Sequence, residues 1–296
     1  MLPPYVDLRP IGRCNLSCPF CFGPRHEVPT MSRVDALRIA VKLRQHDVQG
    51  VVISGGEPTL LQYLAELVNE LSEPQQGSFP PKVVLSTNGL ASLKVMERVL
   101  PGLSWIALPL ESADEKEHRE LRTGSAAPHR DRVLGLLKEV RKNHQDVRVK
   151  LGTVVTRKNV VGAARVLDLI EEDSWLPDVW KVYQMSETNY GADNRDWLSV
   201  GDEEFEEAID RCRQAAEERG VALRVYRNTT REGSYFFIDP DGEVVVIDEG
   251  GERRLGNFFT LIERGAERPV DLVLSSRNAE NFLGTYPDKP SEGSER

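Results

Sequence analysis

The sequence predicts an α/β fold of six parallel strands alternating with helices, followed by a smaller α+β extension at the C-terminal end. Short β-branched runs alternate with longer stretches of helical periodicity through the first 185 residues. This alternation is typical of parallel βαβ units with right-handed crossovers. The central strands, such as Val51-Val52-Ile53 and Val83-Val84-Leu85, are apolar throughout, so we expect both of their faces to be covered. After Gln184 the regular alternation of strands and helices ends.

The elements follow one another in a regular order. The predicted strands of the core are Tyr5–Ile11, Gly50–Ile53, Lys82–Ser86, Trp105–Leu110, Val147–Thr156 and Val179–Gln184. The helices predicted between and after them are Ser32–Gln45, Thr59–Leu71, Leu93–Leu100, Arg130–Asn143 and Val160–Glu172. We therefore expect a core domain over residues 1–190.

The second part of the chain has a different pattern. A helix is predicted at Asp202–Arg219, where apolar residues recur at i, i+3, i+4 and i+7, and a strand at Val221–Tyr226. The turn Asp239-Pro240-Asp241-Gly242 indicates a hairpin, because proline and glycine favour tight turns. We expect an α+β extension over 191–285 and a flexible tail over 286–296, which is rich in Pro, Ser, Gly and charged residues.

The composition is that of a globular protein. The 296 residues are 40% hydrophobic and 29% charged, with a net charge of −9. This charge opposes binding to the backbone of DNA or RNA, so we expect no nucleic-acid polymer as a partner. No apolar run approaches the ~20 residues that cross a bilayer, and the first residues show no targeting pattern, so we expect a cytoplasmic protein without membrane contact. A small anionic substrate needs only a local cluster of Lys and Arg.

Three of the four cysteines, Cys14, Cys18 and Cys21, lie close together, whereas Cys212 is isolated. In a reducing compartment, clustered thiols are metal ligands more often than disulfides. Thiolates at this spacing let one loop bind three irons of a [4Fe-4S] cluster and leave the fourth iron open to another ligand. The alternative is a zinc site with His26 as the fourth ligand, although the spacing matches no common zinc pattern.

The CxxxCxxC loop after the first strand, with Phe20 before its third cysteine, resembles the signature of the radical S-adenosylmethionine (radical SAM) superfamily. The resemblance implies a partial (βα)6 TIM barrel and a [4Fe-4S] cluster on Cys14, Cys18 and Cys21. It also implies that SAM binds the open iron and is cleaved by one electron to a 5′-deoxyadenosyl radical, which abstracts a hydrogen atom from the substrate. A reductase such as flavodoxin or ferredoxin would supply the electron.

Further segments match the same family in order. Ser54-Gly55-Gly56-Glu57-Pro58 resembles the GGE motif that binds the amino group of SAM, since glycines allow close approach of the backbone and Glu57 can pair with an ammonium group. Ser86-Thr87-Asn88-Gly89 resembles the polar turn near the cofactor ribose, and Arg122 is where relatives have an arginine near the carboxylate. Taken singly, the first motif is an ordinary turn and Arg122 a solvated side chain. The cofactor-binding residues that the resemblance implies are Phe20, Ser54, Gly55, Gly56, Glu57, Ser86, Asn88 and Arg122.

The cysteine count excludes a second cluster held by four cysteines, because only Cys212 remains. Among one-cluster enzymes, the chain from about residue 5 to residue 250 resembles viperin and its prokaryotic relatives. The segments that carry this resemblance are Phe22, Trp180–Gln184, Val200–Phe205 and Ser234–Asp239. It implies that a hydrogen atom is removed from the ribose 4′ carbon of a nucleoside triphosphate and that the 3′ hydroxyl is then lost.

The viperin resemblance also implies substrate residues. It puts Lys150, Lys181 and Arg122 near the triphosphate and Tyr235 on the segment that folds over it, with cationic side chains suited to an anion. Alternation along Trp180–Gln184 puts Lys181 and Tyr183 on one face, and leaves open which face lines the barrel. The expected substrate-binding residues are Lys150, Lys181, Tyr183 and Tyr235.

The chain departs from the viperin pattern at Leu16, at Glu111 and at Gly152. Its hairpin followed by Leu255-Gly256-Asn257 also resembles peptide- and sugar-modifying relatives. One alternative is therefore a radical SAM epimerase or dehydratase that acts on a sugar, nucleoside or peptide in natural-product biosynthesis. Another is a non-catalytic iron–sulfur or zinc-binding module.

The isolated cysteine and the histidines are further candidates for function. Cys212 fits a buried position on its helix stripe, and the alternative is a catalytic hydrogen donor that quenches a substrate radical, as in radical epimerases. The five histidines are expected in loops or on polar faces, and we assign none of them a catalytic role.

Overall fold

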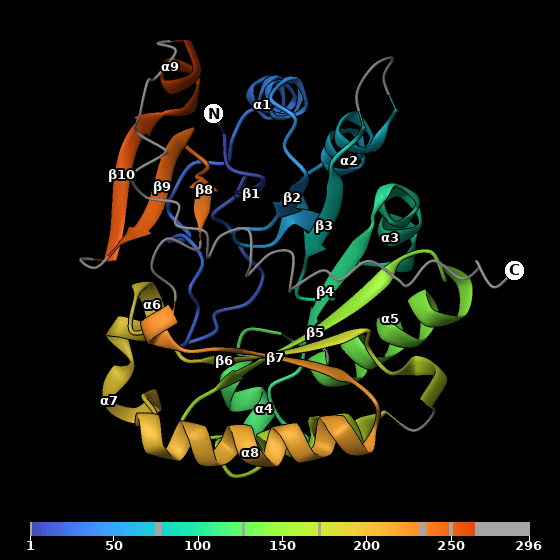
Figure 1. Ribbon diagram of the computed structural model, residues 1–296, viewed down its shortest axis with the longest axis vertical. Coiled ribbons are helices and arrows are strands. Elements are labelled where there is room, and N and C mark those ends of the chain that lie inside the picture. Colours follow the sequence, from blue (N-terminus) through green and yellow to red (C-terminus); the bar gives the residue numbers. More distant parts are fainter. Residues whose placement is uncertain are drawn as a thin grey trace, which may run out of the picture.

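The computed structural model describes residues 2–74, 79–125, 128–170, 173–230, 235–248 and 251–263. The predicted tail, 286–296, and the last part of the predicted extension lie outside these residues. Figure 1 shows one curved sheet with the longer helices along its outer side. This layered arrangement is the one expected of repeated βα units. Within the described ranges, no helix is long and apolar enough to cross a membrane.

The strands of the described residues form one ten-stranded sheet with the order β10-β9-β8-β1-β2-β3-β4-β5-β6-β7. The six strands of the core are β1 (Tyr5–Leu8), β2 (Gly50–Ile53), β3 (Lys82–Ser86), β4 (Trp105–Pro109), β5 (Arg148–Val155) and β6 (Val179–Gln184). They pair in parallel in chain order, which confirms the predicted fold class. Strand β1 is shorter than predicted because Pro10 has no N–H to continue the ladder.

The helices of the core cover the outer side of the sheet. They are α1 (Arg33–Gln45), α2 (Leu64–Ser72), α3 (Leu93–Val99), α4 (Glu115–Leu121) and α5 (His129–Asn143), with the 3₁₀ helices η1 (Pro58–Leu60), η2 (Leu100–Gly102), η3 (Ala163–Leu169) and η4 (Asp173–Trp175). Helix α1 begins where the Ser32 side chain accepts a hydrogen bond from the Asp35 N–H at 3.0 Å. Such an N-cap satisfies a backbone donor that the helix leaves unpaired.

Two of the predicted helices differ from those observed. The segment Thr59–Leu71 is divided into η1 and the later-starting α2, and Val160–Glu172 contains the 3₁₀ helix η3 in place of an α-helix. Val160, Val161 and Gly162 all have low helix propensity. The buried residues Ala163 and Val166 are three positions apart, which suits the period of a 3₁₀ helix.

The chain after residue 190 extends the same sheet at both edges. Its elements are α7 (Arg195–Leu198), α8 (Asp202–Glu218), β7 (Ala222–Tyr226), η5 (Asn228–Thr230), β8 (Phe236–Ile238), β9 (Glu243–Asp248), β10 (Gly251–Asn257) and α9 (Phe258–Glu263), preceded by α6 (Asn189–Asp193). Strand β7 pairs with β6, and β8 pairs with β1 at the other edge. The predicted hairpin is confirmed, since β8 and β9 are antiparallel around Gly242, which has a φ of 80°. The domain boundary at residue 190 stays a prediction.

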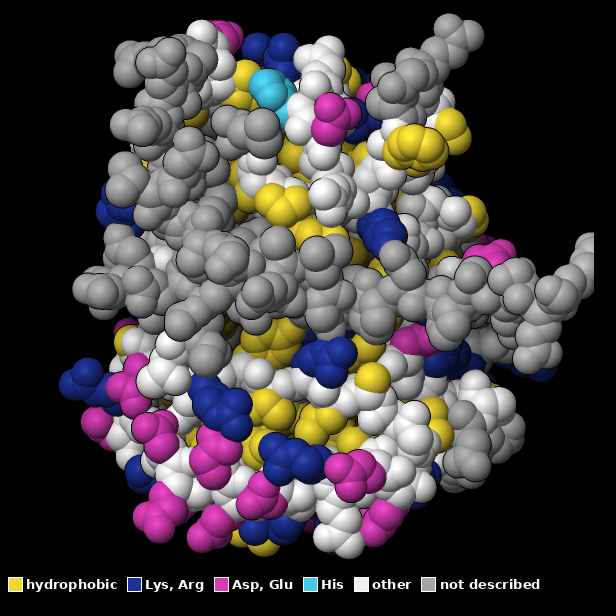
Figure 2. Space-filling view, viewed as in Figure 1, with side chains coloured by type: hydrophobic (Ala, Val, Ile, Leu, Met, Phe, Trp, Pro, Cys, Tyr) yellow, Lys and Arg dark blue, Asp and Glu magenta, His cyan; other side chains and the backbone are white. Residues whose placement is uncertain are grey.

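Helix α8 illustrates how the outer layer is built. Its stripe Phe205, Ala208, Ile209 and Cys212 is buried, as predicted. Figure 2 shows acidic side chains gathered over the outer face of this helix. The apolar stripe therefore packs on the sheet while the charged face meets water.

The two faces of the parallel sheet differ in character because successive side chains point to opposite sides. Trp180 and Val182 are buried in the main hydrophobic core with the helices. Lys181 and Tyr183 lie on the other, inner face, in register with Gly152 and Val154 of β5. The question that the alternation left open is thus answered: Lys181 and Tyr183 face the inside of the curved sheet.

Candidate active site

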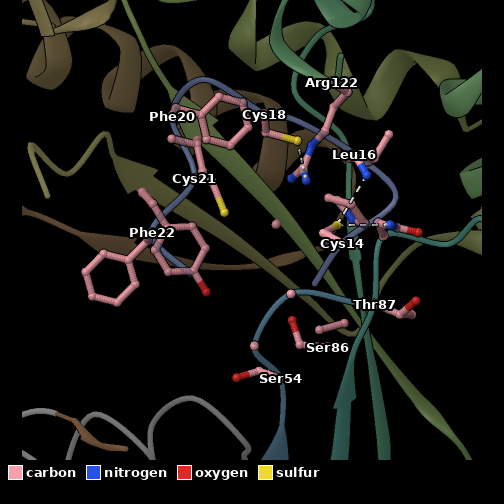
Figure 3. Close-up of a pocket in the computed structure, with 18 of the residues that line it drawn as sticks. Cys14, Leu16, Cys18, Phe20, Cys21, Phe22, Ser54, Ser86, Thr87 and Arg122 are labelled. Atoms are coloured by element: carbon pink, nitrogen blue, oxygen red, sulfur yellow. Dashed lines mark hydrogen bonds between the residues drawn. The ribbon is translucent and has the colours of Figure 1, made fainter. Parts of the chain in front are cut away.

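A cavity of about 300 Å³ lies at the carboxyl ends of the parallel strands (Figure 3). The cysteine loop forms one wall, and the turns that follow β2 and β3 form another. Strands β5 and β6 contribute Lys150, Gly152, Val154, Tyr183 and Gln184. This is the end of the sheet at which barrel enzymes hold their ligands.

The thiols of the loop all line this cavity and are free cysteines. Figure 3 shows their sulfur atoms along one side of it. Each sulfur has an N–H donor nearby: Leu16 N lies 3.4 Å from Cys14 Sγ, Gly23 N lies 3.3 Å from Cys21 Sγ, and Arg122 Nη1 lies 3.6 Å from Cys18 Sγ. Such donors stabilise the thiolates of iron–sulfur sites, so the loop fits a cluster bound by three thiolates.

The surroundings of the loop are apolar. Leu16 and Phe20 are 2% and 5% exposed and pack with Cys18 in one hydrophobic cluster. Burial raises the pKa of Cys18 to about 12, and Arg122 opposes this rise. Within the described part of the chain, no three His, Cys, Asp or Glu side chains converge on a site for one metal ion. Thiolates that bind different irons of a cluster need no such convergence.

His26, the fourth ligand of the zinc alternative, also lines the cavity. Its ring packs against Tyr190 with 5.2 Å between ring centres, and its backbone N–H donates to the Tyr190 hydroxyl at 3.0 Å. These contacts give His26 a packing role beside the loop.

The glycines of the turn after β2 are required by a close approach of the chain to itself. Gly55 has a φ of 108°, and a Cβ there would lie 2.3 Å from the Ile11 carbonyl oxygen. A Cβ on Gly56 would lie 2.2 Å from the Gly12 oxygen. The Gly56 N–H also donates to Ile11 O at 2.7 Å. The turn therefore holds the segment that leads into Cys14.

Glu57 does not enter the cavity. Its side chain is buried, and its carboxylate accepts hydrogen bonds from Thr59 N (3.0 Å), Thr59 Oγ1 (2.6 Å), Thr87 Oγ1 (2.8 Å) and Asn88 N (2.7 Å). Burial raises its pKa, and these four bonds oppose the rise. The expectation that this carboxylate pairs with an ammonium group is corrected: Glu57 ties the ends of β2 and β3 together beneath the cavity.

Arg122 is held by the buried acid Glu111, a position at which the sequence departs from the viperin pattern. Glu111 is fully buried, and its Oε1 accepts from Arg122 Nε at 2.9 Å and from Nη2 at 2.5 Å. Its other oxygen accepts from Val154 N at 2.6 Å. Arg122 also lies over the Phe20 ring, with 5.1 Å from Cζ to the ring centre. Arg122 is thereby fixed on the cysteine side of the cavity.

Two buried lysines lie on the inner face of the sheet. Lys150 lines the cavity, whereas Lys181 is not among its lining residues and has its Nζ 4.6 Å from the centre of the Tyr226 ring. Burial lowers the pKa of Lys150 to about 8, against the attraction of Asp7. Burial, followed by Lys150 and Arg224, lowers the pKa of Lys181 well below its usual value. An anionic ligand bound beside these two lysines would favour their charged forms.

Aromatic side chains form another part of the cavity wall. Phe22 and Tyr235 line the cavity, with 6.0 Å between their ring centres, and Tyr235 stacks on Phe237 at 5.2 Å. Arg9 lies over Phe237, with 3.2 Å from Cζ to the ring centre. Planar groups of this kind can stack against a base or a ring.

Cys212 does not belong to the candidate active site. It is fully buried in the main core on the outer side of the sheet, and burial raises its pKa to about 12. It does not line the cavity. The hypothesis that it donates a hydrogen atom to a substrate radical is therefore wrong on geometry, because the sheet separates the thiol from the cavity.

The segment 189–198, which contains α6 and α7, was not predicted, and we call it the clamp. Its Asn189 and Asn194 side chains donate to Phe22 O (3.2 Å) and Pro19 O (3.1 Å) of the cysteine loop. Arg25 pairs with Asp193 at 2.5 Å. The asparagines in this polar stretch were the available signal, because Asn189 adopts a φ of 49° that few other residues tolerate.

The prediction for the histidines is wrong at two positions. His118 and His129 are 0% and 2% exposed and contact each other. His129 begins the apolar stripe of α5, four residues before the buried Val133 and seven before Leu136, so its helical spacing was an available signal of burial.

Comparison with known proteins gives consistent matches. The sequence model of the radical SAM superfamily matches residues 8–169. A relative from Flammeovirga pacifica, named S-adenosylmethionine-dependent nucleotide dehydratase, is 25% identical over 250 residues, covering 81% of each chain. A protein of the same name from Thermoplasmatales archaeon strain ISO4-H5 is 26% identical over 262 residues, covering 88% of this chain and 89% of its own. The structure of Streptococcus suis SuiB bound to S-adenosylmethionine superposes with a TM-score of 0.67 at 17% identity, over 95% of this chain and 68% of SuiB.

Proposed function

Because the chain belongs to the radical SAM superfamily, we propose that this radical SAM enzyme dehydrates a nucleoside triphosphate. A hydrogen atom is removed from the ribose 4′ carbon, and the 3′ hydroxyl then leaves. The observation that carries the proposal is one cavity that combines three cysteine thiols with a buried lysine. Relatives named nucleotide dehydratases, matched over most of both chains, support the same substrate class.

Cys14, Cys18 and Cys21 would hold the [4Fe-4S] cluster. When bound, the cluster supplies the electron for reductive cleavage of SAM, whose products carry out the hydrogen abstraction. The chain's contribution is to shield and orient. Leu16 and Phe20 keep water from the loop, since both are buried.

The turns after β2 and β3 are the proposed SAM site. The backbone of Gly55 and Gly56 is open to the cavity and suits the amino group, and Ser54, Ser86 and Asn88 offer polar groups for the ribose. Arg122 suits the carboxylate, because a guanidinium binds a carboxylate through two parallel bonds. Glu57 acts indirectly by holding both turns.

The lysines of β5 and β6 are the proposed triphosphate site. Lys150 lines the cavity, and Lys181 lies on the inner face of the neighbouring strand, where a bound triphosphate would favour its charged form. Tyr183 and Tyr235 line the same space and suit packing against the nucleoside. Loss of a hydrogen atom and a hydroxide leaves the substrate one electron short, so a proton and a second electron are needed to release water. A reductase such as flavodoxin or ferredoxin is therefore part of the proposal.

The test is anaerobic. The protein, loaded with iron and sulfide, is incubated with SAM, dithionite and each nucleoside triphosphate in turn, and 5′-deoxyadenosine is measured. We expect one triphosphate to accelerate SAM cleavage by about tenfold or more and to yield a nucleotide lighter by one water. Cleavage that is equally fast with and without every triphosphate would reject the substrate class and leave sugars or peptides as the next set to test.

A further inference from the structure

His118, in the middle of α4, and His129, at the start of α5, form a buried polar pair. Nε2 of His118 lies 2.8 Å from Nδ1 of His129, and the rings are stacked with 5.1 Å between their centres. Neither residue lines the cavity. A polar pair this deep needs all of its hydrogen bonds, since an unpaired buried group is costly.

The two ends of the pair determine where its protons lie. The Glu111 N–H can only donate, and it lies 3.3 Å from Nδ1 of His118, which therefore has no hydrogen. The Asn88 carbonyl can only accept, and it lies 2.8 Å from Nε2 of His129, which therefore has one. The bond between the rings is satisfied when Nε2 of His118 donates to Nδ1 of His129. Both rings are then neutral and carry their hydrogen on Nε2.

The surroundings favour this neutral state. Burial lowers the pKa of His118 to about 3, with further contributions from His129, Arg122 and Arg130. Burial and Arg122 lower the pKa of His129 to about 4. A proton added to Nδ1 of His129 would face the Nε2–H of His118 and break the bond between them.

Each end of the pair leads to a cluster cysteine. Asn88 Nδ2 lies 3.8 Å from Cys14 Sγ, and it donates to Asn15 Oδ1 at 2.7 Å. At the other end, Glu111 holds Arg122, whose Nη1 lies 3.6 Å from Cys18 Sγ. The bonds from Asn88 O to Glu111 N thus form one continuous path beneath the cysteine loop.

We propose that His118 and His129 are positioning residues, a two-histidine relay that sets the N–H donors of Asn88 and Arg122 against the sulfurs of Cys14 and Cys18. The inference rests on the proposed function, because those donors matter most when the sulfurs carry a cluster. Hydrogen bonds to cluster sulfurs raise the reduction potential by stabilising the added electron. A loosened relay should make the cluster harder to reduce.

The first test is a redox titration of the loaded protein followed by electron paramagnetic resonance. At the potential where half of the wild-type cluster is reduced, we expect His129→Leu to be reduced about threefold less. His129→Gln should restore much of the reduced fraction, because its amide can donate to Asn88 O. The matched control is Leu137→Ala, a buried position on α5 outside the relay, which should lower the melting temperature without changing the reduced fraction.

The second measurement needs no cluster. Nitrogen NMR of the 15N-histidine-labelled, metal-free chain should show neutral rings with the hydrogen on Nε2 at both positions. A charged ring, or a hydrogen on Nδ1, would overturn the relay. If wild-type protein binds no iron, the proposed function fails while this measurement still tests the hydrogen-bond path.

Variants that do not fold are replaced by His118→Asn, whose side-chain oxygen can still accept from Glu111 N while its contact with His129 is lost. It should lower the reduced fraction as His129→Leu does. An unchanged potential in His118→Asn and in every folded His129 variant would contradict the positioning role, and so would an equal shift in Leu137→Ala.

Discussion

The buried acids Glu57 and Glu111 show how single residues divide the work of this cavity. Each has its carboxylate filled by hydrogen bonds from the protein, Glu57 from two strand ends and Glu111 from Arg122 and Val154. Neither carboxylate is left for a ligand. The groups proposed for ligands are the thiols, the glycine backbone, the polar side chains of the turns and the cations, whereas the two buried acids serve the scaffold.

The thiols give the most direct prediction. Replacing Cys14, Cys18 or Cys21 by Ala should lower 5′-deoxyadenosine formation by about 100-fold or more and lower the iron bound per chain, because a cluster held by three thiolates loses one of its ligands. Cys212→Ala is the matched control. It should keep both iron and cleavage, with a loss of about 1 kcal/mol of stability from the buried site. Retained cleavage in a loop variant would contradict the ligand assignment.

The lysines give a prediction about protons. Burial lowers the pKa of Lys150 to about 8, so about half of its charge is absent at pH 8. Burial also lowers the pKa of Lys181 well below its usual value. A bound triphosphate favours the charged ammonium and raises both pKa values, so binding should take up protons, about half a proton or more at pH 8.

Calorimetric titration in buffers of different ionisation enthalpy measures this uptake on the cluster-free chain. Lys150→Met should reduce it, and Lys138→Met, on helix α5, is the control that should not. Proton release, or no exchange at all, would exclude these lysines as the triphosphate site.

At the scale of elements, the sequence patterns predicted what local chemistry determines. The strands, the cysteine loop and the turns after β2 and β3 were all predicted, because apolar runs, cysteine spacing and glycines are local signals. The clamp, the relay and the burial of Glu57 were missed. Each of them depends on contacts between segments far apart in the chain, such as Asn194 with Pro19. Periodicity marks a buried polar residue only where it lies on an apolar stripe, as His129 does on α5, and it says nothing of the partner that satisfies it.

The clamp gives the prediction at this scale. Asn194→Ala removes the bond to Pro19 O, worth about 1 kcal/mol, together with the local bonds of its side chain to Tyr190 and Trp197 within the clamp. It should loosen the cysteine loop more than the fold as a whole. We expect the cluster absorbance of the loaded protein to fall about threefold faster with a chelator, at a nearly unchanged melting temperature. Asp196→Ala is the control in the same segment, because that side chain is 97% exposed. Equal rates in the two variants would show that the clamp does not hold the loop.

At the scale of the whole molecule, the first strand and the strands after residue 235 belong to one sheet. Strand β8 pairs with β1, and Arg9 pairs with the buried Asp239 at 3.5 Å. The cavity is lined by residues from Cys14 to Ser186 and by Tyr235, so the chain after residue 190 contributes to its wall. The matches to nucleotide dehydratases along most of the chain agree with this, since the extension is matched together with the core.

The stability of the folded chain should depend on pH through the two buried histidines. The histidines of the relay have folded-state pKa values of about 3 and about 4, below the ordinary value of 6.5. Between these values the unfolded chain binds more protons than the folded chain, so stability is full above about pH 6.5 and falls as the pH drops. From pH 7 to pH 5 the expected loss is about 2 kcal/mol per histidine. Asp7 and Glu57, with raised pKa values, act in the opposite direction and are the same in every variant compared.

Urea unfolding of the metal-free chain at pH 7 and pH 5 isolates the contribution of the relay. His129→Gln should be less stable than wild type at pH 7 but should lose about 2 kcal/mol less on going to pH 5. His46→Gln, at an exposed position, should follow the wild-type pH dependence. If His129→Gln loses as much stability as wild type between the two pH values, His129 is charged in the folded state. The neutral hydrogen-bonded pair that positions Asn88 and Arg122 would then be excluded.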